Sequence, residues 1–63
     1  MQTKTITYKK NQLGQWRRDD GEAEKNVTED AMFREIAKLM TDDWIVVRTE
    51  GLTEIQMVTV EKK

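Results

Sequence analysis

The sequence contains no cysteine, no histidine and no serine. Without these residues the usual pairs of nucleophile and general base cannot be built, and zinc sites of the cysteine and histidine type are excluded. The glycines stand singly at positions 14, 21 and 51, so a glycine-rich loop that could cradle phosphate is missing as well. These absences predict a protein that is not an enzyme and that carries no cofactor and no metal.

Adjacent acids are the remaining candidates for acid–base catalysis or for a hard metal ion, at Asp19-Asp20 and at Asp42-Asp43. Their spacing does not match a calcium-binding loop. The alternative is that they are solvated residues of a connecting loop and of a helix end. So short a chain leaves little room for a pocket that excludes water, which favours this second interpretation.

A chain of 63 residues is expected to form one small domain. Domains of this size bury only about 60% of the surface that the unfolded chain exposes, so they need additional stabilisation. The absence of cysteine excludes disulfides, and the absence of histidine weakens the case for a metal. Tight packing and self-association remain, and the sequence therefore predicts a homo-oligomer.

Long apolar runs are also missing. The longest, Trp44-Ile45-Val46-Val47, is far shorter than the roughly 20 residues that a membrane-spanning helix needs. The first residues lack the apolar stretch of about 7–15 residues found in signal peptides. The absence of cysteine fits a reducing compartment. We therefore expect a cytoplasmic protein with no membrane partner.

Charge is unevenly distributed along the chain, although the net charge is only −1. Residues 1–18 carry five basic side chains and no acid, whereas residues 19–30 carry six acids and one lysine. Residues 19–27 contain little that could be buried and are predicted to form an acidic, mobile loop. The alternative is that this acidic segment mimics a phosphate chain and occupies a basic site on a nucleic-acid enzyme. The composition favours a solvated linker.

Residues 1–18 are predicted to form a basic β-hairpin, with strands at Thr3–Lys9 and Gln15–Arg18 and a turn at Gly14. The hairpin carries two aromatic and four basic residues, which are Tyr8, Lys9, Lys10, Trp16, Arg17 and Arg18. Aromatic side chains interleaved with cations are typical of proteins that bind single-stranded nucleic acid, and a basic ribbon can enter the major groove of DNA. The alternative is that both aromatics belong to the core. The net negative charge and the acidic segment favour the core interpretation.

Residues 28–41 carry the clearest helix signal. Thr28 is a good N-cap, and Glu29 and Asp30 follow in the first turn, where the helix dipole favours acids. Apolar side chains then recur along one face, at Met32, Phe33, Ile36, Ala37, Leu39 and Met40. This spacing predicts an amphipathic helix over residues 29–40.

Residues 44–60 are predicted to form a second β-hairpin, whose two-residue turn at Glu50-Gly51 pairs Val46 with Ile55. Both faces of this hairpin carry apolar side chains, yet a single helix covers only one face of a sheet. The second face must be covered by something else, and we predict that it forms an interface. The residues predicted on that face are Ile45, Val47, Val58 and Val60.

Together these patterns predict an α+β fold of ββαββ order, in which a mostly antiparallel sheet packs on one amphipathic helix. The function that fits is a non-enzymatic protein–protein interaction module that self-associates through the apolar sheet face or binds a second protein. Nucleic-acid binding through the N-terminal hairpin is the alternative. The small size and the lack of a chemical motif are typical of accessory or regulatory proteins, including those encoded by prophages.

Overall fold

The structure, a computed structural model, describes residues 3–62 and contains one helix and one five-stranded sheet. The elements in chain order are β1 (Lys4–Lys10), β2 (Trp16–Asp19), β3 (Glu24–Val27), α1 (Glu29–Met40), β4 (Ile45–Glu50) and β5 (Met57–Lys62). All neighbouring strands are antiparallel, in the order β3-β2-β1-β5-β4. The predicted α+β class is confirmed. Residues 1, 2 and 63, which the predicted domain included, lie outside the described residues.

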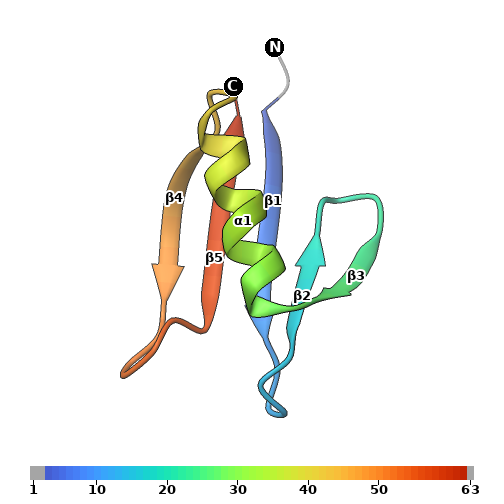
Figure 1. Cartoon of the computed structure of the whole chain (residues 1–63), viewed down its shortest axis with the longest axis vertical. Helices are drawn as coiled ribbons and strands as arrows, with labels where there is room; N and C mark the ends of the chain where they lie inside the picture. Colours follow the sequence, from blue (N-terminus) through green and yellow to red (C-terminus); the bar gives the residue numbers. More distant parts are fainter. Residues whose placement is uncertain (1–2, 63) are drawn as a thin grey trace.

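Helix α1 begins where the sequence predicts. The side chain of Thr28 accepts a hydrogen bond from the backbone N–H of Ala31 at 3.1 Å, which satisfies one of the free donors of the first turn. Met32 and Ile36 are buried against the sheet. Figure 1 shows α1 lying along the central strands β1 and β5, with β4 to one side of it and β2 and β3 to the other.

The chain turns back onto the sheet directly after α1. Asp43 adopts a left-handed conformation with a φ of 66°, and the backbone N–H of Trp44 donates to the carbonyl of Leu39 at 3.2 Å. This arrangement closes the helix end and brings the Trp44 side chain back to the core, where it is buried.

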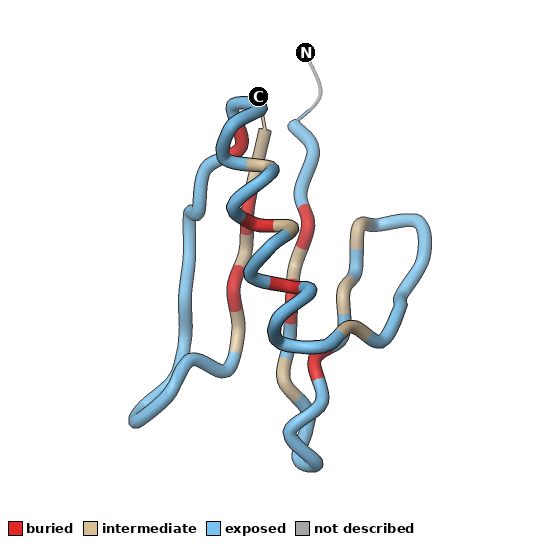
Figure 2. The backbone as a smooth tube through the Cα atoms, in the orientation of Figure 1, coloured by how far each residue is buried: buried red, intermediate tan, exposed pale blue. Residues whose placement is uncertain are grey.

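One hydrophobic core lies between α1 and the inner face of the sheet. Its members come from every element except β3 and β4 and are Ile6, Tyr8, Trp16, Met32, Ile36, Trp44, Val58 and Val60. Figure 2 shows these buried positions concentrated along α1, β1 and β5, whereas β4 is exposed over its whole length. The core is therefore centred under the helix and does not extend to β4.

The predicted two-residue turn between the last strands is wrong. Strand β5 begins only at Met57, so residues 51–56 form a longer loop, which the backbone N–H of Gln56 closes by donating to the carbonyl of Glu50 at 2.7 Å. The register consequently pairs Val46 with Val60 instead of Ile55. A bulge between Val46 and Arg48 changes the register by one residue within β4.

The predicted interface face is also wrong, because its four residues do not share a face. Val58 and Val60 are 4% and 0% exposed and belong to the core under α1. Ile45 and Val47 are 52% and 44% exposed. Only an odd shift of register exchanges the faces of a strand, and the bulge between Val46 and Arg48 supplies it: before the bulge, Ile45 pairs with Glu61 and so lies on the face opposite Val58 and Val60.

The face of the sheet opposite α1 is mostly polar, so the apolar second face that the sequence suggested does not exist. Strand alternation and cross-strand pairing place on it Thr5, Thr7, Lys9, Arg17, Asp19, Glu24, Asn26, Arg48, Glu50, Thr59 and Glu61, together with Ile45 and Met57. An antiparallel sheet with one covered face and one polar, solvated face needs no second layer.

The acidic segment 19–27 contains a strand that the sequence did not predict. β3 pairs antiparallel with β2 through its backbone, although three of its four residues are exposed. The carboxylates of Asp19 and Asp20 accept hydrogen bonds from the backbone N–H groups of residues 21–23, at 2.8 to 3.0 Å, and so form the turn between the two strands. Burial patterns cannot reveal such a strand, because it buries almost nothing.

The loop between β4 and β5 depends on Gly51. Its φ is 153°, and a Cβ atom added there would lie 1.9 Å from the backbone oxygen of Glu54. We expect Gly51→Ala to lower the free energy of unfolding in urea by about 3 kcal/mol, because both the backbone conformation and the contact become strained.

The matched control is Gly21→Ala. Gly21 also has a positive φ, but a Cβ atom added there would meet nothing within 4 Å. We expect Gly21→Ala to lower the free energy of unfolding by only about 1–2 kcal/mol. Equal losses for the two variants would contradict the role assigned to the Glu54 contact.

Candidate functional site

The aromatic residues of the predicted nucleic-acid site are not on the surface. Tyr8 and Trp16 are buried members of the core, on the α1 side of the sheet. A base can stack only on an exposed aromatic face. The structure therefore supports the core interpretation of these two residues, and the proposed stacking platform is wrong.

The basic residues of the same hairpin do not form one patch. Cross-strand pairing places Lys9 and Arg17 on the polar face, whereas Lys10 and Arg18 lie on the α1 side. Arg17 pairs with Glu24 at 3.3 Å and Lys10 pairs with Glu54 at 3.1 Å. The cations are therefore divided between two faces, and three of the four are paired with acids.

A cluster of polar side chains ties α1 to the N-terminal strands. Tyr8 donates its hydroxyl hydrogen bond to Oε1 of Glu35 on α1, and Arg18 Nε donates to the same oxygen at 2.6 Å. Arg18 Nη1 also lies 3.1 Å from Oδ2 of Asp20. The cluster links α1 to the hairpin formed by β1 and β2, which precedes it in the chain.

The protonation of this cluster follows from its contacts. Burial and the hydrogen bond to the Glu35 carboxylate raise the pKa of Tyr8 well above its usual value of 10.0. Burial tends to raise the pKa of Glu35, but the hydrogen bonds from Tyr8 and Arg18 and the charge of Arg18 outweigh it and lower the pKa. Backbone hydrogen bonds from Glu22 and Ala23, reinforced by Arg18, lower the pKa of Asp20 to about 2. At neutral pH the cluster is therefore an ion pair with a neutral tyrosine.

A shallow groove between the start of β1 and the loop after β2 borders this cluster. Its charged lining residues, Lys4, Arg18, Asp20 and Glu22, are of both signs, and Arg18 is already bound to two carboxylates. Within residues 3–62, no group of three or more acidic side chains could hold a metal ion. The cluster is best described as structural.

The two edges of the sheet differ in chemistry. The β3 edge has four residues, three of which are Glu24, Lys25 and Asn26, as is usual for a strand that avoids pairing. The β4 edge has six residues, all exposed, and begins with Ile45, Val46 and Val47. An exposed apolar edge offers unpaired backbone groups to another strand.

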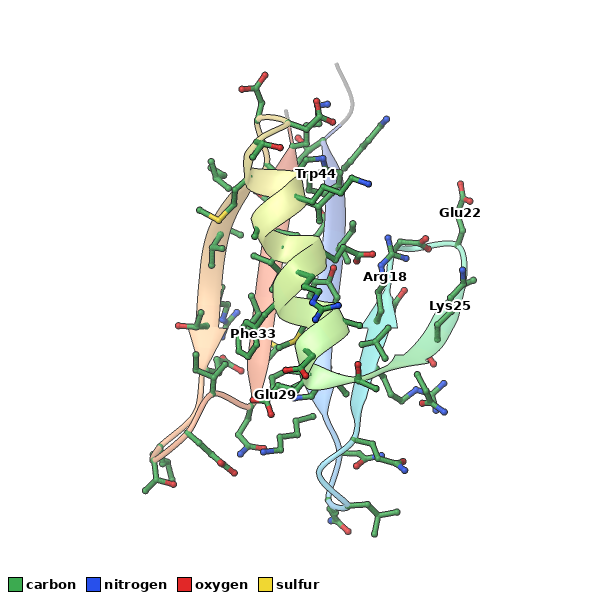
Figure 3. All side chains as sticks on the ribbon, in the orientation of Figure 1. Arg18, Glu22, Lys25, Glu29, Phe33 and Trp44 are labelled. Atoms are coloured by element: carbon green, nitrogen blue, oxygen red, sulfur yellow. The ribbon has the colours of Figure 1, made fainter. Side chains whose placement is uncertain are left out.

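Apolar side chains of α1 lie beside the β4 edge. Phe33, Ala37 and Met40 follow one another at the spacing of a single helix stripe, and Phe33 and Met40 are 47% and 55% exposed. Figure 3 shows Phe33 on the side of α1 nearer to β4. Val46 faces the same layer because it pairs with Val60. We call the outer edge of β4 with Val46 and this helix stripe the β4 surface.

The sequence contained part of the signal for the β4 surface. The helical pattern is wider than the stripe that one sheet can bury, with Phe33 and Met40 at its margin, and Ile45 and Val47 were predicted at an interface. The edge position of β4 could not be read from the chain, because it depends on β1 pairing with β5.

Comparison with protein-family models, with curated proteins and with solved structures found no match. Among the residues that the structure describes, no helix is long and apolar enough to cross a bilayer.

The buried hydroxyl of Tyr8 predicts alkaline instability. The unfolded chain releases the tyrosine proton near pH 10, whereas the folded chain retains it. Above pH 10 the folded state therefore binds more protons, and stability falls as pH rises, by up to about 1.4 kcal/mol per pH unit. Tyr8 is the only tyrosine, so absorbance at the tyrosinate band reports on it alone. The rise in tyrosinate absorbance, which reports ionisation of Tyr8, should therefore occur at the same pH as unfolding of the chain.

The control for this prediction is Tyr8→Phe, which lacks the ionising group and should lose stability less steeply between pH 10 and pH 12. Tyrosinate formation near pH 10 in a chain that is still folded would show that the hydroxyl is accessible, against the structure.

Proposed function

We propose that this protein is a non-enzymatic protein–protein interaction module that binds another polypeptide through the β4 surface. The observation that carries the proposal is the contrast between the two sheet edges. The β3 edge is short and charged, whereas the β4 edge is longer, exposed throughout and apolar in its first three residues. The bulge beside Val47 and the charged residues Arg48 and Glu50 protect only the second half of β4, so its apolar half is the part of either edge best suited to bind.

The chemistry of the β4 surface fits the addition of a strand. A bound strand would take its main-chain hydrogen bonds from the free backbone groups of β4, and its alternate side chains would pack on Val46 and the α1 stripe. Phe33 and Met40 are side chains of the kind that act as anchors in interfaces, one aromatic and one adaptable.

The size of the surface sets the expected affinity. Full burial of one large apolar side chain contributes roughly 1.5–3 kcal/mol. Association costs about 4–15 kcal/mol before any contact contributes. A micromolar dissociation constant needs about 8 kcal/mol of net binding free energy, and a few partly exposed anchors with one strand edge leave less than that. We therefore expect a weak contact, with a dissociation constant in the high micromolar range or above.

Self-association, which the sequence predicts from the small size of the domain, is one form of this proposal. A cytoplasmic location and a role as an accessory protein of the prophage type also belong to it and stay predictions. Nucleic-acid binding has lost its main argument, because Tyr8 and Trp16 are buried and the basic side chains of the hairpin lie on two faces.

The test compares two edge variants in a capture experiment. Tagged protein is incubated with untagged protein and with a lysate of the native cell, and the retained polypeptides are identified by mass spectrometry. We expect Val46→Lys, which places a charge on the exposed β4 surface, to reduce retention of the specific polypeptides at least tenfold. Circular dichroism checks that the variant is folded.

The control variant is Asn26→Lys, which adds the same charge to the opposite sheet edge at an exposed position of β3. It should retain the same polypeptides as the unmodified chain. If both lysine variants behave alike, or if neither changes retention, the β4 surface is not the binding site.

A further inference from the structure

We infer that the β4 surface binds a second copy of this chain, with the two β4 strands paired antiparallel about a twofold axis normal to the sheet. The inference rests on the proposed function, because it names the partner of the same surface. The pairing continues the antiparallel order of the existing five strands and gives one continuous sheet. Both copies of α1 then lie on the same side of that sheet.

The faces of β4 match those of a second β4. Pairing with β5 places Val46 and Thr49 on the α1 side of β4, opposite Val60 and Val58. A register that sets Val46 opposite Thr49 of the partner subunit therefore keeps α1-side residues together. Each side chain stays on its own side of the joined sheet, as strand pairing requires.

The same register accounts for the remaining residues of the strand. Ile45 and Glu50 both lie on the polar face and become opposite neighbours. Val47, the residue at which the β4–β5 register shifts, comes to lie next to the twofold axis. The irregular positions of the two strands then meet at the centre, and regular pairing extends from it in both directions.

The charge of β4 and the nature of the outer strands favour a dimer over longer assemblies. Arg48 and Glu50 pair with each other on β4, so the strand carries no net charge and two copies meet without an excess of one sign. In the dimer the outer edges would be the two β3 strands, which are short and charged. Such edges resist further pairing, so the sheet stops growing at two chains.

Exposed apolar side chains are concentrated at this surface. Of the eight large hydrophobic residues that are exposed within residues 3–62, five lie on α1 or β4, namely Phe33, Met40, Ile45, Val46 and Val47. The other three lie in the hairpin loops. Pairing of the β4 edges covers backbone and apolar side chains together.

The available area predicts a weak dimer. A standard interface takes about 800 Å² from each partner. The whole surface of this chain is 5042 Å², and one strand edge with a helix stripe is a small part of it. We therefore expect a dissociation constant in the micromolar range or above, and the measurements must extend to high micromolar concentrations.

Sedimentation equilibrium of the purified chain, from low micromolar to about one millimolar, tests the inference. The unmodified chain should show a monomer–dimer equilibrium. Val46→Lys and, as a second variant in case the first is unstable, Met40→Lys should each weaken dimerisation at least tenfold, whereas Asn26→Lys on β3 should leave it unchanged. A chain that stays monomeric throughout, or an equal loss in Asn26→Lys, overturns the inference.

The outcome separates this inference from the proposed function. A monomeric chain that still captures a different polypeptide in a Val46-dependent way overturns the dimer and leaves the interaction module standing. Retention that is indifferent to Val46→Lys, with a monomeric chain, overturns both.

Disulfide trapping tests the register, since the chain has no cysteine of its own. Val47→Cys places a thiol next to the axis, within the Cα separation of about 4.4–6.8 Å that a disulfide spans. It should form a covalent dimer under mild oxidation. Glu50→Cys, far from the axis, and Asn26→Cys on the opposite edge should not. Covalent dimers formed equally by all three variants would contradict the pairing.

Discussion

The structure depends on one geometric constraint: a single helix is too narrow for the sheet that it covers. Strands lie about 4.8 Å apart, so five strands span about 19 Å between the outer strand axes. A helix with its side chains is only about 10–12 Å wide. Helix α1 therefore shields β1 and β5, where Tyr8 and Val60 are fully buried. Trp16 on β2 fills part of one flank of the inner face, whereas β4 on the other flank is exposed over its whole length.

The two flanks meet this constraint differently. On the β2 side the gap is bridged by polar groups, since Arg18 reaches Glu35 on the helix and Tyr8 donates to the same carboxylate. On the β4 side the sheet and the helix both present apolar side chains, including Val46 and Phe33, which stay 40% and 47% exposed. The first flank is complete within one chain, whereas the second leaves apolar side chains exposed.

This asymmetry directs the functional argument toward a surface. The residue types of the common catalytic pairs are missing from the sequence, and the acidic pairs are used for local structure: Asp19 and Asp20 form a turn, and Asp43 lies in the helix end. What the fold leaves unused is an exposed strand edge next to an exposed apolar stripe. Binding of a polypeptide is the chemistry that such an edge supports.

The sequence by itself determined the local structure: the helix from its Thr28 cap and its apolar period, the first hairpin from alternation and Gly14, and the α+β class from their sum. These signals depend on neighbours within a few residues. The tertiary structure alone decided that Val58 and Val60 face the helix and that β4 is an edge. Those outcomes depend on strand pairing over long distances, where a one-residue bulge in β4 exchanges the faces of the residues that precede it. Strand β3 belongs with them, because backbone pairing with β2 holds it and its side chains bury almost nothing.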